Sequence, residues 1–159
     1  MKRYRTLSWQ QQNPVAGAGA VIVPSPIQRV RLYSLMFTLT TSAAVANRFV
    51  WLRILDPNNV PVFGTGSGTA IAATTAVDFI ASPASGSVNN AQGPVNTAVG
   101  LDIPNMWLPP GWKIQIGAKA IDVADQFSAI TFAADFAEDI WDEEADQLLA
   151  LNYLHSLTA

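Results

Sequence analysis

The chain has 159 residues, no cysteine and a formal net charge of −3 at pH 7; half of its residues are hydrophobic and 13% are charged. A chain of this length can bury enough apolar surface to fold as one domain without a covalent staple, and the absence of cysteine excludes disulfides, thiol catalysis and cysteine-ligated zinc. A charged fraction this low is unusual for a protein whose whole surface faces water. We therefore expect part of this surface to contact other chains.

Charges of opposite sign are concentrated at opposite ends of the chain. Residues 1–53 contain seven Lys or Arg residues and no acid, whereas residues 122–159 contain nine acids and no Lys or Arg. Such a separation allows attraction within one subunit or between copies. The acidic balance and the scattered arginines give no continuous basic track, so we expect no nucleic-acid partner.

No targeting segment or membrane span is recognisable. The start, MKRYR, has the positive charge of a signal sequence, but the polar residues TLSWQQQNP follow where an apolar stretch is required. No window is long and apolar enough to cross a bilayer. We therefore expect a soluble protein that is made in the cytoplasm without a cleaved signal and has no membrane partner.

Residues 1–26 are expected to form an extended arm. A glutamine-rich stretch is followed by the small-residue run VAGAGA and by a Pro-Ser-Pro corner, and none of this is periodic enough for a helix. Trp9 and the bases Arg3 and Arg5 near the tip suggest that the arm lies across a neighbouring subunit. The alternative is a frayed chain end.

Two strong strands are predicted next. In residues 27–41 one face carries Arg29 and Arg31 and then the apolar residues Tyr33, Leu35, Phe37 and Leu39. This change near Arg31 indicates a β-bulge or a strand that runs from rim to core. In residues 47–56 one face carries Val50, Leu52 and Ile54 and the other carries Phe49 and Trp51. Because both faces are apolar, this strand should be central in a sheet or lie at an interface.

Residues 56–100 are dominated by turn-forming and small residues. A turn at residues 56–59 should return as a strand at 60–63, and a weaker strand is predicted at 70–81 before a long loop at 82–100. The glycine-rich segment 64–68 superficially resembles a phosphate-binding loop. It lacks the Gly-Lys-Ser/Thr ending and the following helix, so a hairpin turn is the better interpretation.

The segment 102–136 contains the clearest β pattern. Its corner, WLPPGW, has prolines that fix φ and Gly111, which can turn sharply. Apolar residues then alternate from Trp112 to Ala118 and again from Ile130 to Phe136, so we expect two antiparallel neighbouring strands that close a β-sandwich.

The C-terminal residues 138–159 carry the only good helix signal. Asp139 is a candidate N-cap, acids follow in the first turn, and Trp141 and Leu148 fall on one apolar stripe. The predicted fold is therefore mostly β: an antiparallel two-sheet sandwich of jelly-roll kind at residues 27–137, with the arm before it and an acidic helix after it.

No catalytic, cofactor or metal site is predicted. His155 is the only histidine, and the terminal acids lack the spacing of a calcium loop. A hydrolase using Asp122 and Asp125 is the weakest hypothesis. Trp107 and Trp112 at the proline corner are a possible glycan platform, although aromatic residues beside prolines more often plug the end of a sandwich.

Three short motifs resemble those of the small structural proteins of tailed-bacteriophage virions. They are Ala46-Asn-Arg-Phe-Val-Trp-Leu, WLPPGW-x-I-x-I and Ala-Asp-Gln-Phe-Ser-Ala-Ile, and the likeness spans about residues 27–137. In that family an N-R strand, a proline corner and a D-Q-x-S-x-I strand belong to a single β-sandwich domain.

The resemblance implies a non-enzymatic virion component that is present in many copies at the capsid surface or head-to-tail junction. Its partners would be copies of itself in a homo-oligomer and other virion proteins. The alternative is a carbohydrate- or receptor-binding module of a virion. The subunit-interface hypothesis names Arg3, Arg5, Trp9, Trp141, Glu143, Glu144 and Leu148.

Overall fold

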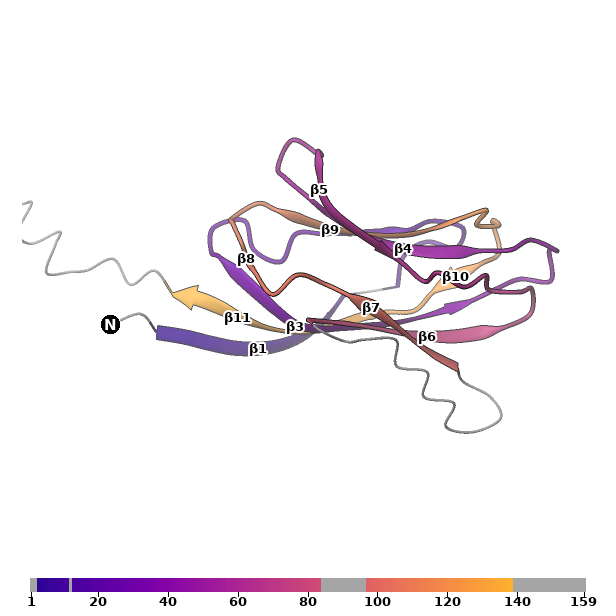
Figure 1. Cartoon of the computed structure of the whole chain (residues 1–159), viewed down its shortest axis with the longest axis horizontal. Helices are drawn as coiled ribbons and strands as arrows, with labels where there is room; N and C mark the ends of the chain where they lie inside the picture. Colours follow the sequence, from indigo (N-terminus) through magenta and orange to yellow (C-terminus); the bar gives the residue numbers. More distant parts are fainter. Residues whose placement is uncertain (1–2, 12, 84–96, 139–159) are drawn as a thin grey trace, which may run out of the picture.

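Two β-sheets pack face to face in the computed structural model, which describes residues 3–11, 13–83 and 97–138 (Figure 1). Every element within the described residues is a strand. The mostly-β, two-sheet architecture predicted from the sequence is therefore confirmed. The predicted C-terminal helix lies outside the described residues.

The first sheet, sheet A, contains the strands that are lower in Figure 1. Its order is β1 (Arg3–Gln11), β11 (Ile130–Glu138), β3 (Val30–Thr40), β6 (Ala76–Ser82) and β7 (Thr97–Asp102). Two short strands, β8 (Trp107–Leu108) and β10 (Gln126–Phe127), pair with opposite ends of β3.

The second sheet, sheet B, lies above sheet A in the same view. Its order is β2 (Ala20–Ile22), β9 (Lys113–Lys119), β4 (Phe49–Leu55) and β5 (Pro61–Gly66). All of its pairs are antiparallel. Because β4 lies between β9 and β5, the prediction of a central strand at residues 47–56 is confirmed.

The core between the sheets is built from alternate residues of each strand. Val50, Leu52 and Ile54 of β4 are at most 1% exposed. The residues of β11 from Ile130 to Phe136 that were predicted to share one face are also buried. Burial of each such side chain stabilises the fold by roughly 1.5–3 kcal/mol, so this alternation accounts for the sandwich.

The register change predicted near Arg31 is a β-bulge. Along β11, Ala133 is paired with Ser34 and Ala134 with Leu32, so Tyr33 is the extra residue of β3. Leu32 and Leu35 are consequently both buried, while Tyr33 is 40% exposed. The bulge therefore lets β3 keep its apolar side chains in the core on both sides of Tyr33.

Two expectations about strand pairing were wrong. The strands β9 and β11 are not neighbours, because β9 lies in sheet B and β11 in sheet A. In addition, the sheets are not purely antiparallel, since β6 and β7 run parallel. The connection between them, residues 83–96, has the length of about a dozen residues or more that a parallel pair requires.

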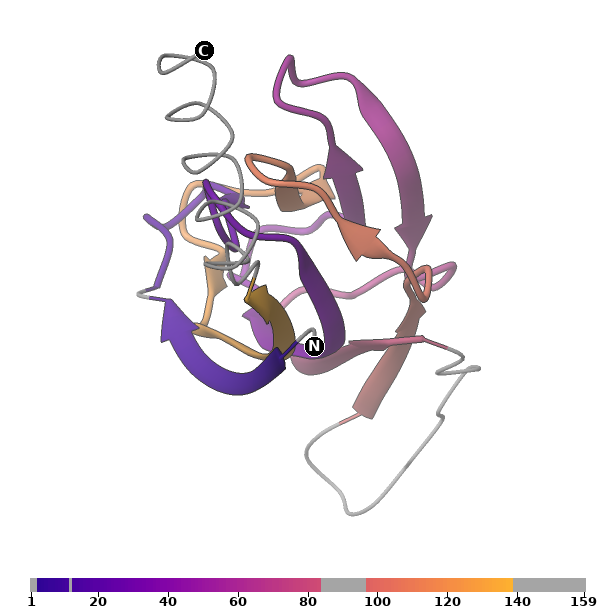
Figure 2. The same cartoon turned by 90° about the vertical axis from the view of Figure 1, so that its left-hand side faces the viewer.

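The N-terminal segment, expected to form an arm, contributes one strand to each sheet. The whole of β1 pairs with β11, from Arg3 opposite Glu138 to Gln11 opposite Ile130, and Figure 2 shows β1 curving along this edge. The connection to β2 is attached to the turn before β10. There the Gly17 amide donates to the Asp125 carbonyl at 2.7 Å, and Gln126 Nε2 donates to the Pro14 carbonyl at 2.8 Å.

The proline corner has the sharp turn predicted for it. Gly111 has a φ of +76°, a conformation that side chains other than glycine rarely adopt. Its amide donates to the Ser25 carbonyl at 2.9 Å. The following Trp112 is partly buried and packs against the core, so the corner closes one end of the sandwich.

Candidate assembly surface

The outer face of sheet B carries the side chains that alternate with the core residues of β2, β4 and β9. Cross-strand register places Phe49 opposite Lys119, Trp51 opposite Gly117, and Arg53 opposite Gln115, which is itself opposite Val21. We call this set the sheet B surface; it consists of Val21, Phe49, Trp51, Arg53, Gln115, Gly117 and Lys119.

Trp51 lies directly on the backbone of Gly117. A Cβ atom built on Gly117 would be 2.4 Å from Cζ2 of the Trp51 indole, which is far closer than two carbons can approach. A glycine is therefore required opposite this tryptophan. The contact holds the six-membered part of the indole against the backbone of β9.

Arg53 covers the same indole. Its guanidinium carbon lies 4.5 Å from the Trp51 ring centroid, which is a cation–π distance. At an exposed position this contact contributes about 0.5–1 kcal/mol. The contact holds the positive charge over the centre of the sheet B surface while Arg53 remains exposed.

A shallow groove lies beside the indole. It has a volume of about 210 Å³ and is lined mainly by Gly19, Val21, Trp51, Gln115 and Gly117. The groove exists because Gly117 of β9 and Gly19, the residue before β2, have no side chains and lie next to each other. The groove has room for an apolar side chain but contains no titratable group that could do chemistry.

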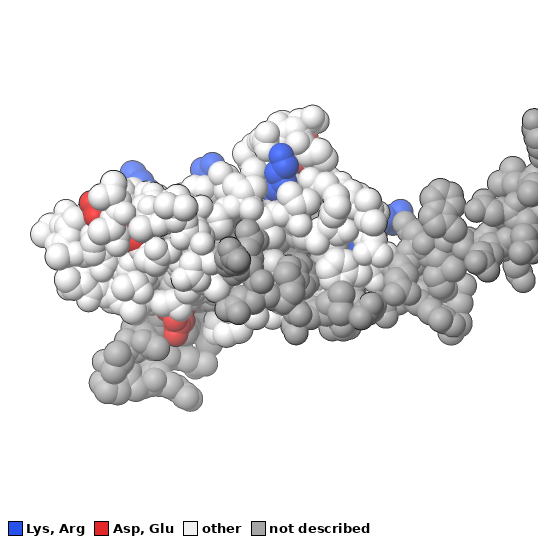
Figure 3. Space-filling model, turned by 180° about the vertical axis from the view of Figure 1, so that it is seen from behind, with Lys and Arg blue, Asp and Glu red and all other residues white. Residues whose placement is uncertain are grey.

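The positive charges of the sheet B surface have no carboxylate partner within the described ranges. The buried ion pair of the sandwich, with an N–O distance of 2.8 Å, joins Arg48 and Asp125, so it does not neutralise Arg53 or Lys119. Lys113 at the rim instead donates to Asn59 Oδ1 at 2.6 Å. Figure 3 shows basic side chains along the upper edge, where sheet B lies, separated by wide uncharged areas.

The outer face of sheet A is different because its polar side chains satisfy one another. Tyr33 donates its hydroxyl hydrogen to Asp135, and Thr38 donates to Asp78 at 2.6 Å. The hydrogen bond to Asp135, together with burial and the nearby negative charge, raises the pKa of Tyr33 above its usual value. These acids are therefore already engaged within the chain.

A buried ion pair joins two loops at one end of the sandwich. Arg48 Nε lies 2.8 Å from Asp125 Oδ2 and Arg48 Nη2 lies 3.0 Å from Oδ1, and both side chains are fully buried. The third guanidinium nitrogen, Nη1, donates to the carbonyls of Ala44 and Ala46. Within the described residues no buried side-chain nitrogen or oxygen lacks a partner, so this pair is a satisfied structural contact.

The same contact argues against a catalytic role for Asp125. Burial by itself would raise its pKa, but hydrogen bonds from Arg48 and from the amides of Asp122 and Ser42 outweigh burial and lower the pKa to about 2. The carboxylate is thus ionised and fully engaged at neutral pH. It cannot act as the general acid that the hydrolase hypothesis required of the Asp122 and Asp125 pair.

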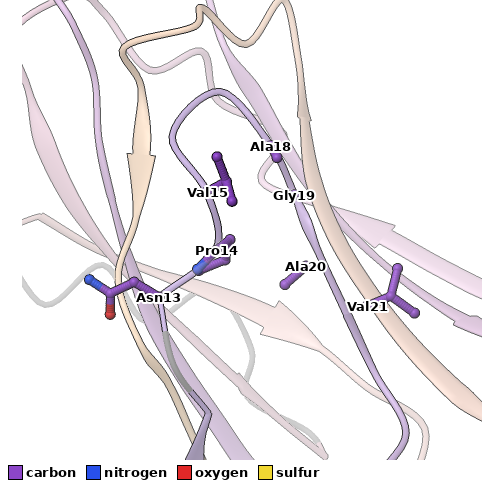
Figure 4. Close-up of a pocket in the computed structure, with 7 residues that line it drawn as sticks. All are labelled: Asn13, Pro14, Val15, Ala18, Gly19, Ala20 and Val21. Carbon is purple, nitrogen blue, oxygen red and sulfur yellow. The ribbon is translucent and has the colours of Figure 1, made fainter.

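A larger open pocket lies at the edge of sheet B. It has a volume of about 540 Å³ and is lined by the segment from Asn13 to Val21. Figure 4 shows Pro14, Val15 and Ala20 pointing into this loop. The lining is apolar apart from backbone groups and one amide, so the pocket offers no acid, base or nucleophile.

The predicted interface residues fall into two groups. Arg3, Arg5 and Trp9 belong to β1, at backbone positions opposite Glu138, Phe136 and Phe132. The C-terminal candidates Trp141, Glu143, Glu144 and Leu148 lie outside the described residues, as does His155. The role of both groups in an interface stays a prediction.

The two tryptophans of the proposed glycan platform occupy different places. Trp107 is in β8, paired with Arg31, whereas Trp112 packs against the core. The position of Trp112 favours the interpretation that the corner plugs the sandwich. Among the described residues there is no group of three or more potential metal ligands, and no helix long and apolar enough to cross a membrane.

Sequence reasoning missed the most distinctive part of the sheet B surface. Trp51 was assigned to the second apolar face of its strand, but Gly117 and Arg53 were not connected with it. The available signal was a glycine inside a strongly alternating strand, which often marks a site where another group approaches the backbone. The cross-strand register was needed to identify that group as Trp51.

Comparisons with known proteins give partial structural similarity only. No protein-family model and no curated protein matches the sequence. A structure of the infectious bursal disease virus Gx strain aligns with 89% of this chain at 13% identity and a TM-score of 0.33. The T13 IBDV viral particle aligns with 86% at 14% identity and a TM-score of 0.32. This chain spans about a third of the length of those proteins, 34% and 31% respectively.

Proposed function

We propose that this chain is a non-enzymatic structural protein of a tailed-phage virion, which assembles in many copies at the capsid surface or at the head-to-tail junction. The observation that carries the proposal is the sheet B surface. It combines exposed apolar and aromatic side chains with cations that have no carboxylate partner in the described part of the chain. A surface of this kind is suited to contact with another subunit.

The composition of the sheet B surface is that of an interface centre. Such centres are enriched in aromatic residues and arginine and depleted in acids. Here Phe49 is 41% exposed and Val21 is 51% exposed, and Arg53 stacks on Trp51 in the same surface. None of the seven residues is acidic, although the chain as a whole has a net charge of −3.

The virion context is supported by the sequence motifs and by what their residues do. Arg48 comes from the N-R motif and Asp125 from the D-Q-x-S-x-I motif, and these two side chains form the buried ion pair. In the same motif, Ser128 Oγ accepts a hydrogen bond from the Thr38 amide at 2.8 Å. The motifs therefore contain residues that hold a β-sandwich together, as the resemblance implies for a scaffold with no catalytic site.

The terminal segments are part of the proposal. We assign Arg3, Arg5 and Trp9, in the edge strand β1, to contacts with a neighbouring subunit, because an edge strand leaves one row of backbone groups for further pairing. We assign Trp141, Glu143, Glu144 and Leu148 of the acidic segment to the same role. Opposite charges on the two segments would then make assembly sensitive to salt.

The test measures assembly of the full-length chain and its incorporation into particles. Sedimentation velocity at rising protein concentration should reveal a symmetric oligomer that weakens in high salt. Mass spectrometry of purified particles should detect the chain, and its copy number relative to the main shell protein would separate capsid decoration from a connector ring. A chain that stays monomeric at high concentration and also fails to join purified particles would contradict the proposal.

A matched pair of variants ties the test to the surface. Phe49→Ser and Val21→Ser remove exposed apolar area from the sheet B surface, whereas Val123→Ser removes an even more exposed apolar side chain from the turn before β10, outside that surface. Only the first two should weaken assembly. Equal effects of all three would mean that the sheet B surface is not the interface.

A further inference from the structure

We propose that the sheet B surface binds the acidic C-terminal segment, residues 138–146, of a second copy of the chain. The inference rests on the proposed function, since it names the part of the neighbouring subunit that the surface takes. The contact would join each subunit to the next in a head-to-tail manner. Such a contact closes into a ring or continues through a lattice, depending on the angle between successive subunits.

The first argument is charge complementarity. Residues 138–146, with the sequence EDIWDEEAD, contain six acids and no base. The sheet B surface contains Arg53 and Lys119 and no acid, and neither cation forms an ion pair within the described residues. By contrast, Arg48 is fully used by Asp125, and Arg31 Nε donates to Asn105 Oδ1 at 2.8 Å. The acidic segment therefore matches the face whose cations are available.

The second argument is the shape of the surface. The groove of about 210 Å³ beside Trp51 is lined by small and apolar residues, with Arg53 held above the indole. A peptide that fits here needs an apolar side chain flanked by acids. The segment has this pattern, because Trp141 stands between Asp139 and Asp142. An aromatic anchor beside a charge-paired rim is the usual arrangement of an interface hot spot.

The third argument concerns which copy supplies the segment. The last described strand, β11, ends at Glu138 in sheet A, while the sheet B surface faces away from sheet A (Figure 1). The three steps from Glu138 to Trp141, the proposed anchor, span at most about 11 Å when fully extended. A path within one molecule must pass β1 and the ~10 Å separation of the sheets before it reaches the outer face. The segment of a neighbour meets no such obstacle.

The experiment uses charge reversal in the full-length chain on both sides of the contact. The surface variant is R53E/K119E and the segment variant is E143K/E144K. Each alone should self-associate at least about tenfold more weakly than the unmodified chain, because it opposes like charges. An equimolar mixture should recover association, since each variant then offers an oppositely charged partner to the other. Sedimentation velocity at low salt measures all three samples.

Controls separate this contact from changes in folding or net charge. Circular dichroism should show that each variant keeps its β structure, and the milder R53Q/K119Q serves if charge reversal disturbs the fold. The variant V45E adds a negative charge at a loop residue that is 98% exposed and lies outside the sheet B surface, and it should associate like the unmodified chain. Loss of association in V45E would show that net charge alone is responsible and would overturn the inference.

Two further results would also overturn it. The first is that R53E/K119E self-associates as strongly as the unmodified chain. The second is that an equimolar mixture of the two folded variants stays monomeric, which would mean that the segment does not bind the sheet B surface of a second copy. Binding of single-stranded DNA that is lost in R53E/K119E while self-association persists would assign the surface to nucleic acid instead. In each case the unmodified chain would still assemble, so the proposed function would stand; it fails only if the unmodified chain neither associates nor joins particles.

Discussion

Two arginines five positions apart, Arg48 and Arg53, occupy opposite environments: Arg48 is buried and Arg53 is exposed. Arg48 is fully buried and its guanidinium is held by Asp125 and by loop carbonyls. Arg53 is exposed and lies over the Trp51 ring, without a carboxylate partner among the described residues. The comparison shows how one side chain can either complete a fold or remain available to a partner, depending on whether the chain itself satisfies its hydrogen bonds.

The largest expected effect is the loss of the buried pair. Arg48→Ala would leave Asp125 as a buried charge without its partner, so the free energy of unfolding should fall by about 3–5 kcal/mol. The matched control Arg53→Ala should cost about 1 kcal/mol or less, because its contact is exposed. Urea unfolding followed by tryptophan fluorescence measures both. Similar losses in the two variants would remove the distinction between the two arginines.

A smaller loss of stability is expected from a change at Gly117, whose backbone contacts the Trp51 indole. Gly117→Ala places a methyl group 2.4 Å from the indole, so the ring and Arg53 must shift at a cost of about 1–3 kcal/mol. Gly64→Ala is the control, because its added carbon would make only ordinary van der Waals contacts, with Arg53 Cγ at 3.8 Å and the Leu52 carbonyl oxygen at 3.9 Å. In the double variant W51A/G117A the indole is absent, so the added methyl group of Ala should cause no further loss of stability. Thermal unfolding that is unchanged in Gly117→Ala would show that the indole does not lie on the backbone.

The smallest effect concerns pH and distinguishes the buried end from the exposed surface. The pKa of Asp125 is lowered from 3.8 to about 2. Its contribution of about 2 kcal/mol to stability should therefore be complete above pH 4 and be lost as the pH falls through about 2. Urea midpoints between pH 5 and pH 2, compared with those of D125N, measure this contribution. Titration of the carboxyl carbon by NMR should give the low pKa directly; a value near 4 would contradict it.

The inward faces of the strands could be predicted because side chains alternate with a period of two. This rule identified Val50, Leu52 and Ile54 of β4, and it also indicated the bulge near Arg31. Alternation says which residues face the core but not which strand is the neighbour. For this reason β9 and β11 were paired in the prediction although they lie in opposite sheets.

The candidate surface was harder to predict than the fold. Arg48 and Asp125 both occur in the motifs used for the resemblance, yet nothing in the sequence indicates that residues so far apart in the chain form an ion pair. Likewise, the contact of Trp51 with Gly117 depends on the register between β4 and β9. Both contacts are long-range; the local pattern offered only the glycine inside an alternating strand, which marks a close approach without identifying the partner.

The pairing of β1 with β11 also has a consequence for biosynthesis. Residues 3–11 leave the ribosome early, but their partner residues 130–138 follow only after most of the chain has been translated. At about 5–20 residues per second, this delay is on the order of ten seconds. During that interval the β1 segment has no partner strand, so sheet A can be completed only after translation has reached β11.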